Sequence, residues 1–579
     1  MAHRAHLFSL RIGHALRDAC FAGERYTPAR LQGDLLAGIS VGIIAIPLAM
    51  ALAIASGVAP QYGLYTAIIG GFVVALTGGS RYSVSGPTAA FVVILYPIAQ
   101  TYGLAGLLLA SVMGGVILIG MAYARLGRFI EYIPQSVTLG FTGGIAIVLV
   151  TLQVKDFLGL PIQEMPEHYL DKILLLARSL HQFDATSVFV ALVTLAIMLS
   201  WPRLKTPIPQ HLPAVIAASL LGVALAHAGY DVDTIGSRFS YVAPDGSRGE
   251  GIPPWLPGFM WPWLQPGPGG EAAAVSWSMI AALIPSAFAI AMLGAIESLL
   301  CAVVLDGMSG KRHSANSELL GQGLGNIVAP FFGGITATAA IARSTANLKA
   351  GAQSPVAAMV HSLVVLLALL CFAPVLAYLP MPAMAALLVV VAWNMSEAHK
   401  SLHLLKRAPL ADIVVLATCL SLTVFFDMVI AITVGVLLAC ILFVSDMAAM
   451  TRITDISGNK KLVDVPLPDR WAVLKINGPL FFAAADRVFG EIAARMSTLD
   501  GVVLYMDGVT LLDAGGVSAL NKLIEHCAAE GRQLYIADLQ FQPLKTLARA
   551  QVSPRQGVTQ FFPTLDEAIQ QLTGVDTPV

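Results

Sequence analysis

The sequence predicts an all-α membrane protein followed by a small soluble α/β domain. Three observations predict this fold class. The 579 residues are 56% apolar and only 12% charged, whereas a soluble protein has about 25% charged residues. The apolar residues gather in long runs between about residues 35 and 444. Residues 1–34 and 450–579 carry an ordinary density of charge. So little polar surface excludes a cytosolic or secreted enzyme.

The net charge, the cysteines and the absence of catalytic motifs argue against nucleic-acid-binding proteins, disulfide-linked proteins and enzymes. The net charge of -1 leaves no basic excess for binding nucleic acid. The six cysteines lie in apolar or terminal stretches without a CxxC pair, which favours buried apolar side chains over a disulfide framework. No Walker loop, HExxH or nucleophile elbow occurs, so we expect no enzyme activity, no cofactor and no metal.

The apolar stretch is long enough for about fourteen membrane spans. A spanning helix needs about 20 apolar residues, and short loops raise the length per span to roughly 30 residues. The runs predict spans near 35–57, 61–78, 86–100, 104–124, 133–154, 185–201, 211–228, 278–304, 315–332, 337–350, 355–373, 380–394, 409–426 and 428–447. Two of them, 86–100 and 337–350, are too short to cross a bilayer as regular helices.

Lysine and arginine in the loops predict the orientation. With these spans, the basic residues of the short loops fall on the side of the N-terminal segment, which is itself rich in arginine. The positive-inside rule then places both termini in the cytoplasm. No signal peptide is expected, because the first apolar run is long and begins after residue 34. The predicted domains are residues 1–34, 35–449 and 450–579.

The terminal domain alternates strands and helices, which is typical of a small α/β domain. Strands are expected at Trp471–Lys475, Gly501–Met506 and Leu534–Ala537. Amphipathic helices are expected near Arg487–Met496, Gly515–Glu530, Gln542–Ala550 and Leu565–Leu572.

The two short runs have the features of half-helices that begin inside the membrane. Before the first lies Ser83–Thr88, in which Pro87 suits a first helical turn and Ser85 is the candidate cap. Before the second lies Phe332–Thr338, with paired glycines. If the two belong to inverted halves, their N-termini face each other, and their free N–H groups attract anions. The alternative is a pair of ordinary helices kinked at Gly and Pro.

Two ionisable side chains within the predicted spans bear on the function, Glu297 and Arg343. Burying the charge of Glu297 in a bilayer costs about 2.5–3.5 kcal/mol, and removal from water favours the protonated carboxyl. Glu297 is therefore the candidate for binding and releasing a proton. Arg343 lies in the second half-helix, where it supplies positive charge to an anion, forms a structural pair with Glu297, or does both.

Three segments resemble the sulfate-permease (SulP) family of anion transporters. They are PLAMALA at 47–53, GVAPQYGLY at 57–65 and VSGPTA at 84–89. The tail resembles the STAS domain that follows the membrane region in this family. Within the family, residues 294–308 and 333–344 are most similar to a bacterial C4-dicarboxylate transporter.

The resemblance implies an architecture and a site. It implies fourteen transmembrane segments in two inverted seven-helix repeats, divided into core and gate domains, a homodimer and elevator-like movement. It places the half-helices at 86–100 and 337–350 and the proton-coupling acid at Glu297. The substrate site implied by the resemblance, together with Arg343, is Ser85, Gly86, Thr88, Ala337, Thr338 and Ala339.

One departure concerns the tail. Related STAS domains that act as phosphorylation switches have a serine after the aspartate of a strand-to-helix turn. Here the turn is Leu511–Gly516, with a glycine where we align that serine. A phosphorylation switch is not expected at this turn, and docking of a cytosolic partner protein stays open.

The sequence thus predicts an inner-membrane carrier that couples a small organic anion to protons. The substrates implied are C4-dicarboxylates such as succinate, fumarate and aspartate. Two alternatives remain: a sulfate or bicarbonate carrier coupled to protons or sodium, and an anion channel or sensor. Besides membrane lipid, the anion and protons, a second copy and a cytosolic protein are the expected partners.

Overall fold

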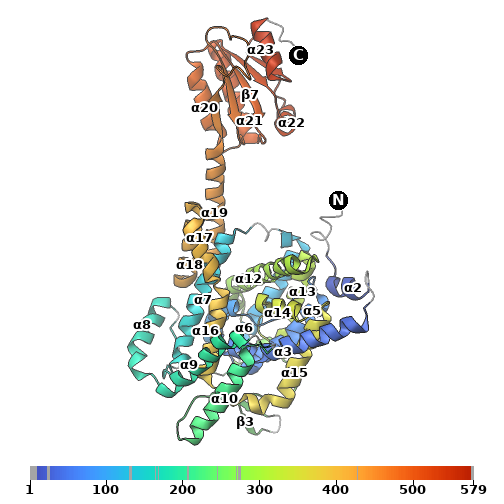
Figure 1. Cartoon of the computed structure of the whole chain (residues 1–579), viewed down its shortest axis with the longest axis vertical. Helices are drawn as coiled ribbons and strands as arrows, with labels where there is room; N and C mark the ends of the chain where they lie inside the picture. Colours follow the sequence, from blue (N-terminus) through green and yellow to red (C-terminus); the bar gives the residue numbers. More distant parts are fainter. Residues whose placement is uncertain are drawn as a thin grey trace. The chain divides into compact units, whose positions relative to one another are not determined.

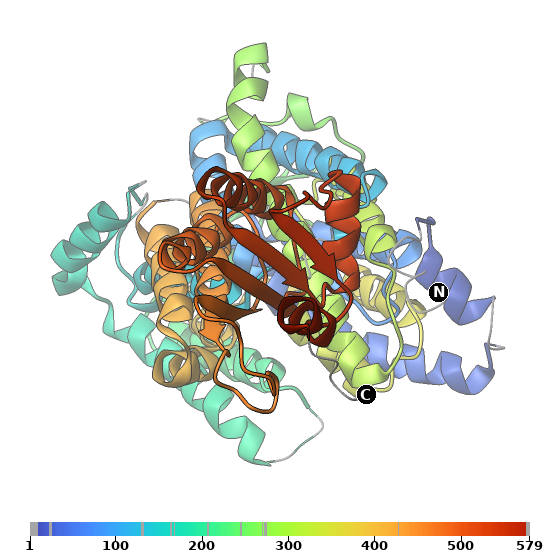
Figure 2. The ribbon, with the colours of Figure 1, turned by 90° about the horizontal axis from the view of Figure 1, so that it is seen from above.

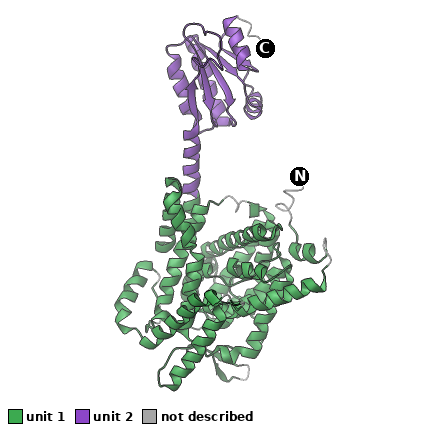
Figure 3. Ribbon diagram, in the orientation of Figure 1, with its two compact units in different colours: residues 1–436 green, residues 437–579 purple. Residues whose placement is uncertain are grey.

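A computed structural model describes most of the chain, and contacts divide it into two compact units. The described residues are 10–21, 26–128, 133–162, 165–166, 168–204, 206, 208–243, 246–268, 270, 275–426 and 428–574. Parts of the predicted N-terminal segment, residues 1–9 and 22–25, lie outside them. The units are residues 1–436 and 437–579 (Figure 3). The predicted domain boundaries stay predictions.

The first unit is almost wholly helical (Figure 1). Its first half contains α2 (His14–Cys20), α3 (Pro28–Ala55), α4 (Pro60–Tyr65), a π-helical turn η2 (Thr66–Gly70), α5 (Gly71–Thr77), β1 (Ser85–Gly86), α6 (Ala89–Tyr123), α7 (Gln135–Phe157), α8 (Tyr169–Ser179), α9 (Ala185–Ser200) and α10 (His211–His227). Its second half contains α11 (Ile235–Arg238), β2 (Ser240–Val242), β3 (Arg248–Glu250), α12 (Trp277–Ser309), α13 (Ala315–Val328), β4 (Thr338–Ala339), α14 (Ile341–Lys349), α15 (Val356–Leu376), α16 (Met381–Met395), α17 (Ala398–Arg407) and α18 (Leu410–Phe425). The helix α19 (Met428–Met450) contains the division between the units.

Every predicted span range contains helix, and the predicted mostly helical membrane fold is confirmed. Eight helical segments of the described residues are long and apolar enough to cross a bilayer: Pro28–Ala55, Ala89–Tyr123, Gln135–Phe157, Ala185–Leu204, Trp277–Ser309, Val356–Leu376, Met381–Arg407 and Met428–Met450. Two shorter apolar helices, His211–His227 and Leu410–Phe425, accompany them. The number of fourteen spans stays a prediction.

The helices α3 and α15 pack closely because glycines remove side chains from their contact. A Cβ on Gly38 would lie 2.6 Å from Cβ of Val360, and one on Gly42 would lie 2.7 Å from Cγ1 of Val364. The spacing of four residues places both glycines on one face of α3. Small residues at this spacing are a common means of bringing helix backbones together in membranes.

The second unit contains a five-stranded sheet in the order β5-β6-β7-β8-β9. The strands are β5 (Arg452–Asp455), β6 (Trp471–Asn477), β7 (Gly501–Gly508), β8 (Gln533–Ala537) and β9 (Thr559–Phe562). The first pair is antiparallel and the others are parallel. The helices are α20 (Ala485–Met496), α21 (Ala514–Glu530), α22 (Phe541–Arg549) and α23 (Leu565–Thr573).

Helices cover both faces of this sheet (Figure 2). Side chains of α20, α21 and α22 join a core with one face, and α23 covers the other. All three predicted strands and all four predicted helices are present, to within a few residues at their ends. The short strands β5 and β9 lie at the two edges and were not predicted.

Cys527 of α21 is buried in this core with 0% of its surface exposed, and burial raises the pKa of its thiol to about 11. Because the thiolate is the reactive form, we expect Cys527 to resist alkylation by iodoacetamide at pH 8 in the folded protein. Mass spectrometry of the full-length protein measures the modified fraction. Denaturant should make Cys527 fully reactive, and equal labelling before and after denaturation would contradict this core.

Candidate functional site

Two helices of the first unit are interrupted where the sequence predicted short spans. The helix α6 has a break at Gly103, whose φ of 64° and ψ of -163° are not helical. Its first part, residues 89–102, is therefore about 21 Å long, and the nine residues of α14 extend about 14 Å. Both fall short of the roughly 30 Å of a hydrocarbon core.

Two extended segments pair immediately before these helices begin. The strands β1 and β4 are antiparallel, with Ser85 opposite Ala339 and Gly86 opposite Thr338. The helices start later than predicted, at Ala89 instead of 86 and at Ile341 instead of 337. The prediction that Ser85 caps a helix was wrong, because its backbone joins the strand pair. In a membrane, backbone groups outside helices need such partners.

Neither helix start is capped by a side chain. The residues before the first turns are Thr88 for α6 and Ala340 for α14, and neither accepts a hydrogen bond from the first turn through its side chain. The first N–H groups of an α-helix have no partner within the helix. At α14, the first two residues of the helix, Ile341 and Ala342, are exposed. The strand pair thus brings two unsatisfied, partly positive helix ends together.

The helix α12 contacts both helix starts through one face. The hydroxyl of Thr88 donates to Oε2 of Glu297 over 2.9 Å. One turn earlier on α12, the carbonyl of Gly294 accepts from Oγ1 of Thr338 over 3.2 Å. Glu297 is only partly buried. Its carboxyl group therefore lies beside the start of α6.

Arg343 is 2% exposed and sits in the first turn of α14. Its Nη2 donates to the carbonyl oxygen of Pro87 over 2.6 Å, whereas Nε and Nη1 are buried without a hydrogen-bond partner. A Cβ on Gly86 would lie 2.8 Å from Nη1. Of the two readings of Arg343 that the sequence left open, the direct pair with Glu297 does not form: no ion pair joins these two described residues.

Three polar residues of α13 hold the strand pair from behind, and the sequence interpretation missed them. Glu318 accepts from the backbone N–H groups of Gly79 and Ser80, each over 2.9 Å. Gln322 donates to both Glu318 and Oγ of Ser85. Asn326 accepts from the N–H of Ala337 over 2.7 Å and donates to its carbonyl over 2.8 Å.

This α13 ladder changes the role expected for Ala337. Its backbone N–H and carbonyl are both used by Asn326, so they do not face a ligand. The signal for the ladder was present in the sequence. Glu318, Gln322 and Asn326 follow one another at intervals of four residues within the predicted span 315–332, and this spacing places them on one helix face.

The other predicted site residues come together around the strand pair. They are Ser85, Gly86, Thr88, Glu297, Thr338, Ala339 and Arg343. Ser85, Gly86, Thr338 and Ala339 lie in the strands and are buried. In the part of the chain that the structure describes, no group of three or more His, Cys, Asp or Glu residues is placed to hold a metal ion.

Comparison with known sequences gives two family matches. The Sulfate permease family matches residues 31–419, and the STAS domain matches residues 463–568. The chain is 38% identical to the putative sulfate transporter YvdB of Bacillus subtilis, over 94% of this chain and 98% of that protein.

Comparison with solved structures finds transporters whose fold is similar to that of this chain. The transmembrane domain of a cyanobacterial bicarbonate transporter, BicA, is 25% identical and has a TM-score of 0.59, covering 72% of this chain and 98% of that one. The murine Solute Carrier 26 family member A9 anion transporter, in the inward-facing state, has a TM-score of 0.79 at 19% identity. That match covers 98% of this chain and 99% of the other.

Gly86 leaves the space that Arg343 occupies, so we expect Gly86→Ala to be destabilising. Its Cβ would displace the buried guanidinium at 2.8 Å, an overpacking that costs about 1–3 kcal/mol. The matched control is Gly294→Ala, because a Cβ there meets its nearest neighbours at 3.6 Å. Thermal unfolding in detergent should show a lower Tm for Gly86→Ala only. Equal Tm values would refute the close packing.

Proposed function

The chain belongs to the sulfate permease family, and on this premise we propose that it is a secondary transporter that couples the uptake of C4-dicarboxylates to protons. As a family member it is a multi-pass membrane transporter of anions. The observation that carries the proposal is the strand pair β1–β4, which brings two uncapped helix starts together beside Arg343 and Glu297.

Anion binding follows from the positive charge gathered at the strand pair. The two helix starts supply N–H groups and partial positive charge. Arg343 supplies a full charge that stays ionised at any physiological pH. Its free Nε and Nη1 are donors without an acceptor, and leaving such buried donors unpaired is unfavourable. A carboxylate or another oxyanion at the strand pair provides the missing acceptors.

Proton coupling follows from the position of Glu297. Its carboxyl group contacts Thr88 at the start of α6, so an anion bound there meets a nearby negative charge unless Glu297 is protonated. The bound anion therefore favours protonation, and protonation favours the anion. Such linkage is reciprocal. The proton and the anion then travel together, and the negative charge of the substrate is partly cancelled.

C4-dicarboxylates are the proposed substrate class because residues 294–308 and 333–344, which contain Glu297 and Arg343, resemble those of a bacterial dicarboxylate transporter. The second candidate substrate is sulfate or bicarbonate. It is favoured by the relatives above, which are described as a putative sulfate transporter and a bicarbonate transporter. The strand pair and Arg343 suit any of these oxyanions.

The rest of the proposal concerns assembly. We propose a homodimer in the bacterial inner membrane, with both termini cytoplasmic and an elevator-like movement of the core against the gate. The STAS domain is proposed to dock a cytosolic protein without phosphorylation at its strand-to-helix turn. A Cβ on Gly515 would lie 2.8 Å from Cα of Phe482, so the turn has little room for a serine.

The Glu297→Gln variant tests the coupling. In proteoliposomes, wild-type uptake of labelled succinate should rise when the outside is made more acidic than the lumen. Because the amide cannot take up a proton, Glu297→Gln should abolish this pH dependence while it keeps the hydrogen bond from Thr88. The control is Asp306→Asn, further along the same helix, where the aspartate bonds His313.

Competition between sulfate and labelled succinate distinguishes the two candidate substrate classes. Succinate uptake that ignores pH in the wild type and is fully blocked by sulfate would overturn the dicarboxylate–proton proposal in favour of the second candidate. Uptake in Glu297→Gln that still follows the pH gradient would remove Glu297 from the coupling.

The Arg343→Ala variant tests anion binding. Losing a charged donor costs about 1.5–3 kcal/mol, so the Kd of the anion should rise by about tenfold or more. Arg343→Lys keeps the charge but loses the fork of donors, and should bind with intermediate affinity. Scintillation proximity with purified protein measures binding. An unchanged Kd in Arg343→Ala would assign Arg343 to the structure alone.

A further inference from the structure

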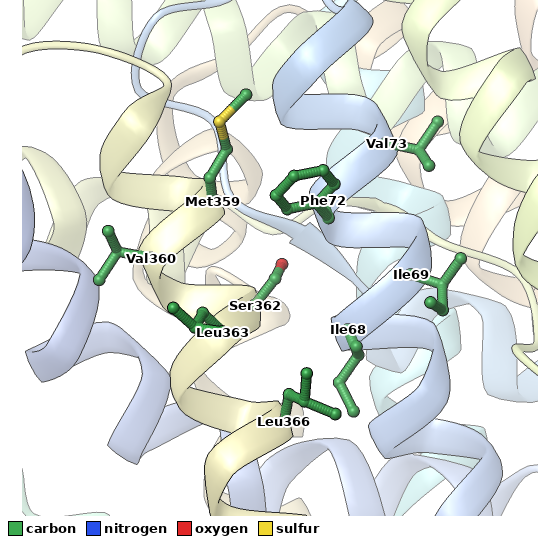
Figure 4. A pocket seen from close by; sticks show the side chains of 9 residues that line it. All are labelled: Ile68, Ile69, Phe72, Val73, Met359, Val360, Ser362, Leu363 and Leu366. Atoms are coloured by element: carbon green, nitrogen blue, oxygen red, sulfur yellow. The ribbon is translucent and has the colours of Figure 1, made fainter. Parts of the chain in front are cut away.

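A groove on the outside of the first unit lies directly behind the candidate site. It has a volume of about 370 Å³ and is lined by η2, α5 and α15 (Figure 4). Phe72 and Leu363 form its rim and are 43% and 53% exposed, whereas Ile68 and Ser362 form its floor and are buried. The size falls within the range of small-molecule sites, about 300–1,000 Å³.

The groove exists because α15 is packed closely on one side only. Towards α3, the glycines Gly38 and Gly42 let the backbones approach. Towards α5, the facing side chains are large, and the π-helical turn Thr66–Gly70 interrupts the α-helical repeat between α4 and α5. Single π-helical turns are frequent at functional sites.

The lining of the groove favours an apolar ligand such as a hydrocarbon chain. Eight of its nine lining residues are apolar. The ninth, Ser362, already donates its hydroxyl to the carbonyl of Ala67 over 2.9 Å, so an apolar ligand leaves that donor satisfied and incurs no penalty for a lost hydrogen bond. A polar ligand would find no partner on these walls.

We propose that this groove binds one acyl chain of a membrane lipid. The helix α15 is long and apolar enough to span a bilayer, and the exposed rim continues into other exposed apolar side chains of α15, Leu367 and Leu370. This outer surface meets lipid in a membrane protein. A lipid tail is therefore the apolar ligand that the groove encounters at the highest concentration.

The groove is connected to the strand pair at Gly71. A Cβ on Gly71 would lie 2.9 Å from Oγ of Ser362, in the floor of the groove, and 2.9 Å from the carbonyl oxygen of Ser85 in β1. Filling the groove therefore supports the wall against which β1 rests. From this contact we expect the acyl chain to strengthen anion binding, a step that rests on the proposed function.

Tryptophan quenching tests the acyl-chain site. Phe72→Trp places an indole at the rim of the groove. The matched control is Leu192→Trp, on the exposed surface of α9, which is also long and apolar enough to span a bilayer and does not line the groove. Delipidated protein in detergent is titrated with phosphatidylcholine whose acyl chains carry bromine, after subtraction of the wild-type signal. Phe72→Trp should be half-quenched at about tenfold less lipid than Leu192→Trp, corresponding to about 1.4 kcal/mol.

The outcomes separate the two steps. Identical titration curves for the two variants would overturn the acyl-chain site, whatever the protein transports. The affinity of the wild type for succinate, measured along the same lipid titration, should rise over the lipid concentrations that quench Phe72→Trp. A succinate affinity that does not change, together with selective quenching, keeps the acyl-chain site and removes its effect on the anion. If the wild type binds no anion at any lipid concentration, the proposed function is contradicted. The quenching result alone then decides whether the acyl-chain site exists.

Discussion

The pairing of β1 with β4 is the contact on which the rest of the first unit depends. Four residues from distant parts of the chain form it, and it solves a problem of backbone chemistry. Two helices that stop short in an apolar surrounding leave N–H and C=O groups without partners. Pairing gives hydrogen-bond partners to backbone groups of the two extended segments. The first N–H groups of α6 and α14 stay without a partner inside their helices. The same two helix interruptions therefore create both the unpaired backbone groups that the strand pair must satisfy and the positive helix ends that attract an anion.

The sequence predicted the parts of this site that depend on local composition. Short apolar runs after SGPT and GGITAT indicated two interrupted helices, and the isolated charges Glu297 and Arg343 indicated ionisable groups within spans. The helix starts were placed too early because pairing between residues 85 and 339 is a tertiary contact, which no local pattern encodes. The same reason explains the missed edge strands β5 and β9, which are short and whose pairing defines them.

The α13 ladder illustrates the opposite case, a pattern that was readable but not used. Glu318 is 1% exposed and Gln322 and Asn326 are 0–1% exposed, so these polar groups are buried with their partners. Buried polar groups are costly unless they are hydrogen-bonded, and hydrogen-bonded groups specify one arrangement; in this ladder Oε1 of Gln322 is left without a partner. Here the arrangement is that of Gly79, Ser80, Ser85 and Ala337, the backbone and hydroxyl groups around both interruptions.

Because α13 hydrogen-bonds groups at both interrupted segments, the proposed anion site would keep its shape during the elevator-like movement proposed above. A binding surface that is carried unchanged between two compartments has the same intrinsic affinity in each. The direction of net flux is then set by the concentrations of solute and coupling ion on the two sides, and reversing those gradients reverses the carrier. On the proposed mechanism, the three polar side chains of α13 would therefore let the carrier run in either direction.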